Sequence, residues 1–153
     1  MVSLTFRHPE YIFGKVYKNN EIFTLTWNVS GQLKKLSTLY VDNLKISEIT
    51  TGENESKATY SFPAGSFAHG AHTIKVEVVG QIDEINTVTA PTFEQEYIFV
   101  EENNLIPVIA CDLKQTSMRQ YDTLNIPIVM YINDPTQSTV IFNLYENYPN
   151  VIG

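Results

Sequence analysis

Two histidines, His69 and His72, lie three residues apart in the stretch SFPAGSFAHGAHTIKVEVVG, residues 61–80. Imidazole nitrogens bind metals and act as general bases, so a pair at this spacing could serve a zinc or catalytic site. A zinc site, however, needs three or four converging ligands. The one cysteine, Cys111, lies far along the chain, and the stretch contains no acidic residue before Glu77. We therefore expect no metal at this position.

The same stretch is typical of a tight connection between two β-strands. Gly65 and Gly70, with neighbouring alanines, allow sharp turns between a strand that ends near Phe62 and one that begins near His72. In such a corner a histidine can hydrogen-bond to local backbone groups and close the connection. The prediction is a structural corner formed by Gly65, Gly70 and His72.

A second candidate site is the acidic stretch VEENNLIP. Its Glu and Asn side chains carry oxygen atoms of the kind that bind calcium, and a calcium ion takes six to eight oxygen ligands. The chain lacks the D-x-D and further acidic segments that a calcium site between two modules needs. A solvated linker is therefore the favoured interpretation, and the weak calcium candidates are Glu101, Glu102, Asn103 and Asn104.

Motifs of catalysis do not occur in the sequence. There is no GxSxG nucleophile elbow, and PAGSFAHG lacks the Lys-Ser/Thr and the helix of a phosphate-binding loop. The carboxylate pairs Asp83–Glu84 and Glu94–Glu96 are expected to be exposed charges on a loop and a strand, whereas a glycosidase needs two converging carboxylates in a cleft. We expect a non-enzymatic protein with no cofactor.

Composition limits the class of partner. The chain has 153 residues, 43% of them hydrophobic, and a formal charge of -7. Binding to nucleic acid needs clustered Lys and Arg, and Lys34-Lys35 is the only basic pair, so no nucleic-acid partner is expected. No apolar run is long enough to span a bilayer, so no membrane insertion is expected. The N-terminus lacks the pattern of a signal peptide, and a single cysteine forms no intrachain disulfide, which together indicate synthesis in a reducing cytoplasm.

Alternating hydrophobicity indicates β-strands. EIFTLTWNVSG places large apolar residues on one face and Thr24, Thr26 and Asn28 on the other. NLKISEIT alternates in the same way, with Leu44 and Ile46 on one face. Short strands at turn-marked spacing over about 100 residues are typical of an antiparallel, immunoglobulin-like β-sandwich, predicted here over residues 1–102. The predicted structural core is Phe23, Leu25, Trp27, Val29, Leu39, Val41, Ile74, Val76 and Val78.

Residues 103–153 repeat the pattern of the beginning. At an offset of 103, and without a gap, Phe23, Leu25, Trp27 and Val29 fall on Ile126, Ile128, Met130 and Ile132. This offset is close to the length of one immunoglobulin-like module, so the sequence predicts a partial second module over residues 103–153. Pro127, within the strand TLNIPIVMYI, indicates an edge or a bulge. The alternative, that the last strands complete the first sandwich, stays open.

Two stretches resemble the tandem immunoglobulin-like modules of bacteriophage tail and appendage proteins and of bacterial surface proteins. One is the corner and strand AGSFAHGAHTIKVEVVG. The other is the junction EENNLIPVIACDLKQTSMRQYDTLNIPIVMYINDPTQSTVIFNL, with its x-P-x-I entry strand and QYDTL lead into the next strand. The resemblance implies a spacer or presentation role at a virion or cell surface, with neighbouring modules as partners. It implies no catalytic residues.

The leading functional prediction is thus a structural or adhesive module. The alternative is a carbohydrate-binding module that contacts glycans through exposed tyrosines or end loops, since nine tyrosines and one tryptophan could stack on sugars. Trp27 shares its face with the predicted core and is expected to be buried.

Overall fold

The computed structural model describes residues 4–111, 120–121, 123 and 126–132. Within this part of the chain the regular elements are β-strands, apart from one 3-10 turn, η1 (Ala64–Ser66). The strands are β1 (Thr5–Arg7), β2 (Val16–Lys18), β3 (Ile22–Ser30), β4 (Lys34–Val41), β5 (Leu44–Thr51), β6 (Lys57–Pro63), β7 (Gly70–Gln81), β8 (Thr87–Thr89), β9 (Phe93–Val100), β10 (Val108–Cys111) and β11 (Ile128–Tyr131). The prediction of an all-β protein is confirmed.

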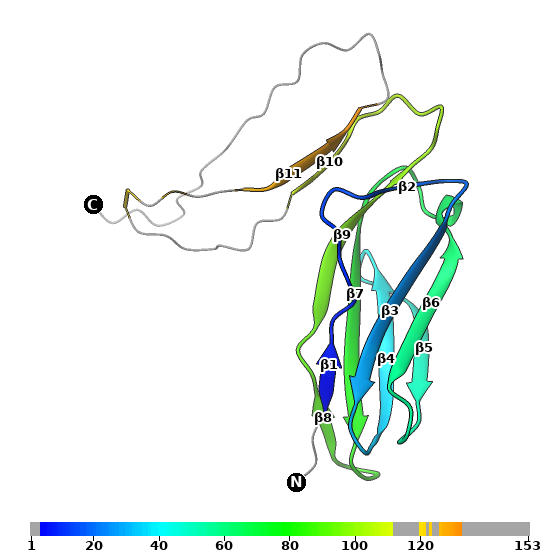
Figure 1. The fold of residues 1–153 in the computed structure, drawn as a ribbon, viewed down its shortest axis with the longest axis vertical. Coiled ribbons are helices and arrows are strands. Elements are labelled where there is room, and N and C mark those ends of the chain that lie inside the picture. The colour runs from blue at the N-terminus through cyan, green and yellow to red at the C-terminus, as the bar shows by residue number, and fades with distance from the viewer. Residues whose placement is uncertain (1–3, 112–119, 122, 124–125, 133–153) are drawn as a thin grey trace.

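Two sheets face each other in the sandwich (Figure 1). One has the order β1-β3-β6 and the other the order β2-β9-β7-β4-β5, with β8 paired to β7. All pairs of the described strands are antiparallel except β2 with β9. The chain leaves the first sheet after β1, crosses to the second sheet and joins its edge as β2, parallel to β9. The placement of β3 and β6 opposite β4, β7 and β9 is an immunoglobulin-like topology, as the sequence predicted.

The core lies between the sheets and follows the alternation of the strands. In β3, buried and exposed positions alternate from Phe23 to Ser30. The predicted core residues are fully or almost fully buried except Val41, which is half-buried and packs against the core. The indole of Trp27 donates a hydrogen bond from Nε1 to Ser37 Oγ at 3.0 Å, so its polar edge is satisfied inside the core.

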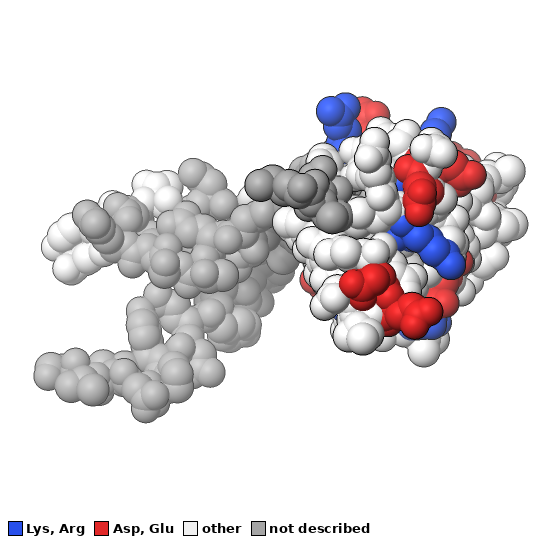
Figure 2. Space-filling view, turned by 90° about the horizontal axis from the view of Figure 1, so that it is seen from below, with Lys and Arg blue, Asp and Glu red and all other residues white. Residues whose placement is uncertain are grey.

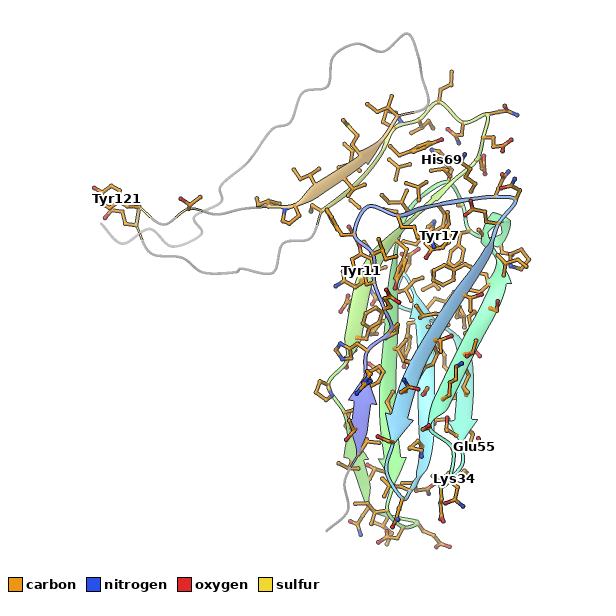
Figure 3. All side chains as sticks on the ribbon, in the orientation of Figure 1. Tyr11, Tyr17, Lys34, Glu55, His69 and Tyr121 are labelled. Carbon is orange, nitrogen blue, oxygen red and sulfur yellow. The ribbon has the colours of Figure 1, made fainter. Side chains whose placement is uncertain are left out.

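Lys35 is a buried cation at the lower end of the sandwich, with 0% of its surface exposed. Its ammonium donates hydrogen bonds to the carbonyl oxygens of Gly31 and Glu55 at 3.1 and 2.7 Å. It thereby ties the β3–β4 turn to the β5–β6 loop, and Figure 3 shows Glu55 next to Lys34 at this end. Of the basic pair Lys34-Lys35, only Lys34 is exposed.

Strand β5 departs from its predicted pattern. Leu44 and Ile46, expected on a buried face, are 70% and 38% exposed. They lie on an edge strand and, with Val41, Tyr60 and Phe62, line a groove of about 480 Å³ where the two sheets separate. Alternation identified the strand correctly, but at this end of β5 the apolar face lines the groove and is not covered by the packed core.

Strands β10 and β11 form a separate two-stranded sheet beyond the end of β9 (Figure 1). Pro127 lies immediately before β11. The last predicted strand, STVIFNLYE, lies outside the described residues, and so does most of residues 112–125. The division into modules at residues 102 and 103 therefore stays a prediction.

Among the described residues no helix is long and apolar enough to cross a membrane. Figure 2 looks at the end of the sandwich away from β10 and β11 and shows acidic and basic side chains interspersed there.

Candidate functional site: the histidine corner and the junction

The corner is built by two glycines and one turn. Pro63 precedes η1, and β7 begins at Gly70, two residues before the predicted start at His72. Gly70 has φ +144°, a conformation that residues with a Cβ rarely adopt. A Cβ on Gly65 would lie 2.9 Å from the carbonyl oxygen of Asn19, so only glycine fits where the corner meets the chain after β2. Both glycines thus have the steric role that the sequence suggested.

His72 connects the corner to the β4–β5 hairpin. Its Nδ1 lies 2.6 Å from Asp42 Oδ2, and its Nε2 lies 2.7 Å from the carbonyl oxygen of Ala68. A carboxylate and a carbonyl both accept, so both bonds form at once only when the ring carries two protons. Asp42 and Asn43 both have positive φ, which is the geometry of a two-residue type I′ hairpin turn.

The charge of Asp42 is stabilised by this arrangement. Partial burial raises the pKa of its carboxyl, but hydrogen bonds from His72 and from the Thr73 N–H, with the charge of His72, outweigh burial. The pKa of Asp42 therefore lies below its ordinary value of 3.8. The Thr73 N–H donates to Asp42 Oδ1 at 2.9 Å.

His69 binds a different part of the chain, the linker between β9 and β10. Its Nε2 donates to the carbonyl oxygen of Ile106 at 2.7 Å, and its Nδ1 accepts from the Glu101 N–H at 3.0 Å. One donor and one acceptor match a neutral ring that carries its proton on Nε2. Figure 3 shows His69 between the sandwich and the chain that leads to β10.

The two histidines therefore do not converge on one point. Each uses both ring nitrogens, His72 within the sandwich and His69 toward the linker. Within the described residues, no group of three or more His, Cys, Asp or Glu side chains is placed to hold a metal ion. The corner is a hydrogen-bonded connection. Through His69 it also contacts the linker between β9 and β10, called the junction below, which the sequence did not indicate.

The acidic linker is held by hydrogen bonds among its own residues, from both the backbone and the side chain of Asn104. Asn104 N–H donates to the Glu101 carbonyl at 3.1 Å, and the Asn104 side chain accepts from the Ile106 N–H at 3.0 Å. The Asn104 amide also donates to Glu101 Oε2 at 3.5 Å. Glu102 and Asn103 lie beside Glu101 around a shallow polar hollow. These contacts describe a folded turn. The sequence favoured a linker over calcium, and these contacts do not test the weak calcium candidates Glu101, Glu102, Asn103 and Asn104.

The junction also has an apolar contact. Ile98 and Val100, on the outer face of β9, pack with Val108 and Ala110 of β10 and with Val129 of β11. The last four residues of β9, from Tyr97 to Val100, are all buried, because the sandwich covers one face and the β10–β11 sheet covers the other. Ile98 and Val100 are not among the predicted core residues, although four consecutive apolar residues are typical of a strand buried on both faces.

The predicted carboxylate pairs lie on a loop and on a strand, and among the described residues neither pair lines one of the four grooves and hollows found. Asp83 is exposed and caps a turn, and hydrogen bonds from Asn86 and from the Ile85 N–H lower its pKa. Glu84 is exposed beside it. Glu94 is exposed on β9 and Glu96 half-buried, with its carbonyl oxygen accepting from the Tyr11 hydroxyl at 3.0 Å.

Several tyrosines belong to the core rather than to a surface platform. Tyr11 contacts the ring of Tyr97 edge-on, and Tyr17 packs against Phe23 and Phe99. The Tyr97 hydroxyl is buried without a hydrogen-bond partner, and burial raises its pKa strongly. Tyr121 is 95% exposed. Glycan binding through exposed tyrosines or end loops stays a prediction.

Comparison of the chain with protein-family models found no match, and comparison with curated proteins found none either. Among solved structures, the chain is similar to the CARDB domain of the PF1109 protein from Pyrococcus furiosus, determined in complex with di-metal ions. The identity is 13%, the match covers 65% of this chain and 94% of that one, and the TM-score is 0.42. A likeness of this size carries no inference about what the chain binds.

Proposed function

We propose that the chain is a non-enzymatic structural module, a spacer or presenter in a tandem immunoglobulin-like array of a virion appendage or cell-surface protein. The observation that carries the proposal is the junction. Apolar packing on Ile98 and Val100, with one hydrogen bond donated and one accepted by His69, holds the linker and the following strands on the first sandwich. A spacer needs such fixed joints, because loosely linked domains move relative to one another by default.

The pairing of β10 with β11 supports a second module of the same type. Strand β1 pairs antiparallel with β3, and at the offset of 103 these strands fall on β10 and β11, which also pair antiparallel. At this offset the pair Phe6↔Val29 predicts that Ile109 lies opposite Ile132. In the structure Ile109 lies opposite Met130, two residues earlier. A shift of two residues leaves every side chain on the same face, so the correspondence of faces holds.

The face expected to form the core of this second module is apolar and open. Ile109 and Ile128 are 49% and 45% exposed, and Met130 shares their face. Such a face is expected of one half of a sandwich. The proposed partners are therefore neighbouring modules, and the proposed mechanism is mechanical: serial modules with fixed joints hold a binding tip at a distance.

Thermal unfolding of residues 1–103 beside the full chain tests the proposal. We expect the shorter chain to melt cooperatively, at a lower temperature than the full chain because Ile98 and Val100 lose their cover. Noncooperative or absent melting would mean that the last strands belong to the first sandwich. A self-contained binding domain would then be the better hypothesis.

A further inference from the structure

Strand β3 has an open edge in the upper part of the sandwich. On one side it pairs with β6 along Ile22–Asn28, but on the other it pairs with β1 only from Asn28 to Ser30. The chain leaves this edge after Arg7, passes through Pro9 and joins the opposite sheet as β2. Proline has no N–H to continue the ladder.

The direction of the backbone groups along this edge follows from the register. The Val29 N–H donates to the carbonyl oxygen of Ser56, and the Ala64 N–H donates to the carbonyl oxygen of Glu21. The backbone groups of the odd-numbered residues of β3 therefore bond toward β6. In an antiparallel ladder the residues between them direct N–H and C=O to the other side. Thr24 and Thr26 therefore aim their backbone groups at the open edge, while their hydroxyls bond across to Ser61 and Thr59.

A groove lies directly beside these groups. It has a volume of about 440 Å³ and runs between β3 and the crossing segment 8–15 that leads to β2. Figure 3 shows Tyr11 and Tyr17 on the chain that passes beside β3. Arg7 and Lys15 line the groove with one acidic residue, Glu10, so it is locally cationic on a chain of net charge -7.

We propose that this groove takes an extended peptide strand of another protein, which adds to the edge of β3 in line with β1 and carries a carboxylate toward Arg7 and Lys15. Strand addition supplies affinity through main-chain hydrogen bonds and specificity through alternate side chains. The open edge from Ile22 to Thr26 is about 13 Å long at the usual rise per residue. The crossing segment lines the groove opposite β3, so the proposed occupant is a single extended strand and not the edge of another folded sheet.

Amide hydrogen exchange of the full chain, read residue by residue by NMR, tests the open edge without any ligand. The amides of Phe23, Leu25 and Trp27 are expected to be protected, and those of Thr24 and Thr26 to exchange at least about a hundredfold faster, since only the former are paired. Equal protection along β3 would show that the edge is closed and would overturn the proposal.

A titration tests the ligand. The probe is a capped synthetic peptide of alternating Thr and Val with one central Glu, and its control is the same peptide N-methylated at alternate amides. The unmodified peptide is expected to shift the Thr24 and Thr26 amide signals and to slow their exchange, and the N-methylated peptide to do neither. Equal binding of both peptides, or signals that shift only elsewhere, would exclude strand addition.

Charge variants test the recognition of the carboxylate. Lys15→Glu is expected to weaken binding of the probe by at least about tenfold, because a like charge then faces the peptide. Lys18→Glu makes the same change on an exposed residue of β2 that does not line the groove, and little effect is expected. Equal weakening by both variants would reduce the effect to net charge and contradict a carboxylate seated in the groove.

Discussion

In the proposed repeat, the strand pair β10–β11 corresponds to the strand pair β1–β3 at an offset of 103, and the two pairs differ in chemical character mainly on one face. Their inward faces are both apolar, with Phe6 and Trp27 in one and Ile109 and Met130 in the other. Their outward faces differ. In the first pair this face carries Thr5, Arg7, Thr26 and Asn28, and in the second it carries Val108, Ala110, Val129 and Tyr131.

The difference shows how the outward face of a strand pair can form either a solvated surface or a joint. The polar outward face of β1–β3 is solvated, with Thr5, Arg7 and Asn28 exposed. The apolar outward face of β10–β11 packs on Ile98 and Val100 of the first sandwich. Four outward positions thus account for the attachment of the second sheet, and the inward face is left for a core.

The largest expected effect is a difference in the loss of stability when the inward face of each strand pair is truncated. Trp27→Ala removes a buried indole and is expected to lower the free energy of unfolding by about 3–5 kcal/mol. Met130→Ala at the corresponding position is expected to cost about 1 kcal/mol or less, because its face is open. Urea unfolding measures both. Similar losses at the two positions would show that the second inward face is already enclosed.

The next effect tests the joint. Ile98→Ala is expected to cost about 2–3 kcal/mol, since Ile98 is buried between the two sheets. Glu94→Ala, on the same face of β9 away from the joint, is the control and is expected to change stability by less than about 0.5 kcal/mol. If chemical denaturation finds Ile98→Ala as mild as the control, the sheet does not cover β9.

A smaller effect is expected from the hydrogen bonds of His69. His69→Phe keeps a ring but removes both bonds to the linker, at a net cost of about 1–2 kcal/mol. The cost should be local: the Glu101 amide should exchange faster, while amides in the centre of β7 keep their rates. Unchanged exchange at Glu101 would remove His69 from the account of the joint.

The smallest effect concerns pH. The pKa of Asp42 is lowered in the fold, so its charge contributes stability above the ordinary pKa of 3.8, and this contribution is lost as pH falls through the lowered value. Asp42→Asn keeps a residue that favours the positive φ of the turn. Thermal melts between pH 7 and pH 3 should therefore show a slightly smaller acid destabilisation for the variant than for the parent chain. An identical pH profile would contradict a stabilising charge at Asp42.

Local patterns predicted much of the sandwich. Alternation in EIFTLTWNVSG and HTIKVEVVG placed Trp27 and Val76 in the core because a residue's face in a strand is decided by its neighbours in sequence. The same rule placed Leu44 wrongly, since it does not reveal which strand lies at an edge. Lys35 shares the inward face with Leu39, a signal that could have identified it, but one of its two carbonyl partners, Glu55, comes from the β5–β6 loop, which the local pattern does not place.

The joint was harder to predict from the sequence. His69 lies next to a glycine in a corner, and nothing near it indicates that its partners are Glu101 and Ile106. Such contacts depend on how two units are placed, which local propensity does not determine. The four apolar residues that end β9 were the available signal, and they point to a cover without saying what provides it.

The most direct test of a fixed joint uses the chain's own cysteine. Cys111 is exposed on β10, and Lys57→Cys adds a second site on β6, so spin labels at the two positions report the distance between the sheet and the sandwich. Pulsed electron spectroscopy should give one narrow distance distribution, which broadens when His69→Phe and Ile98→Ala are combined. A broad distribution in the otherwise unchanged chain would show that the second sheet moves freely and would contradict the spacer account.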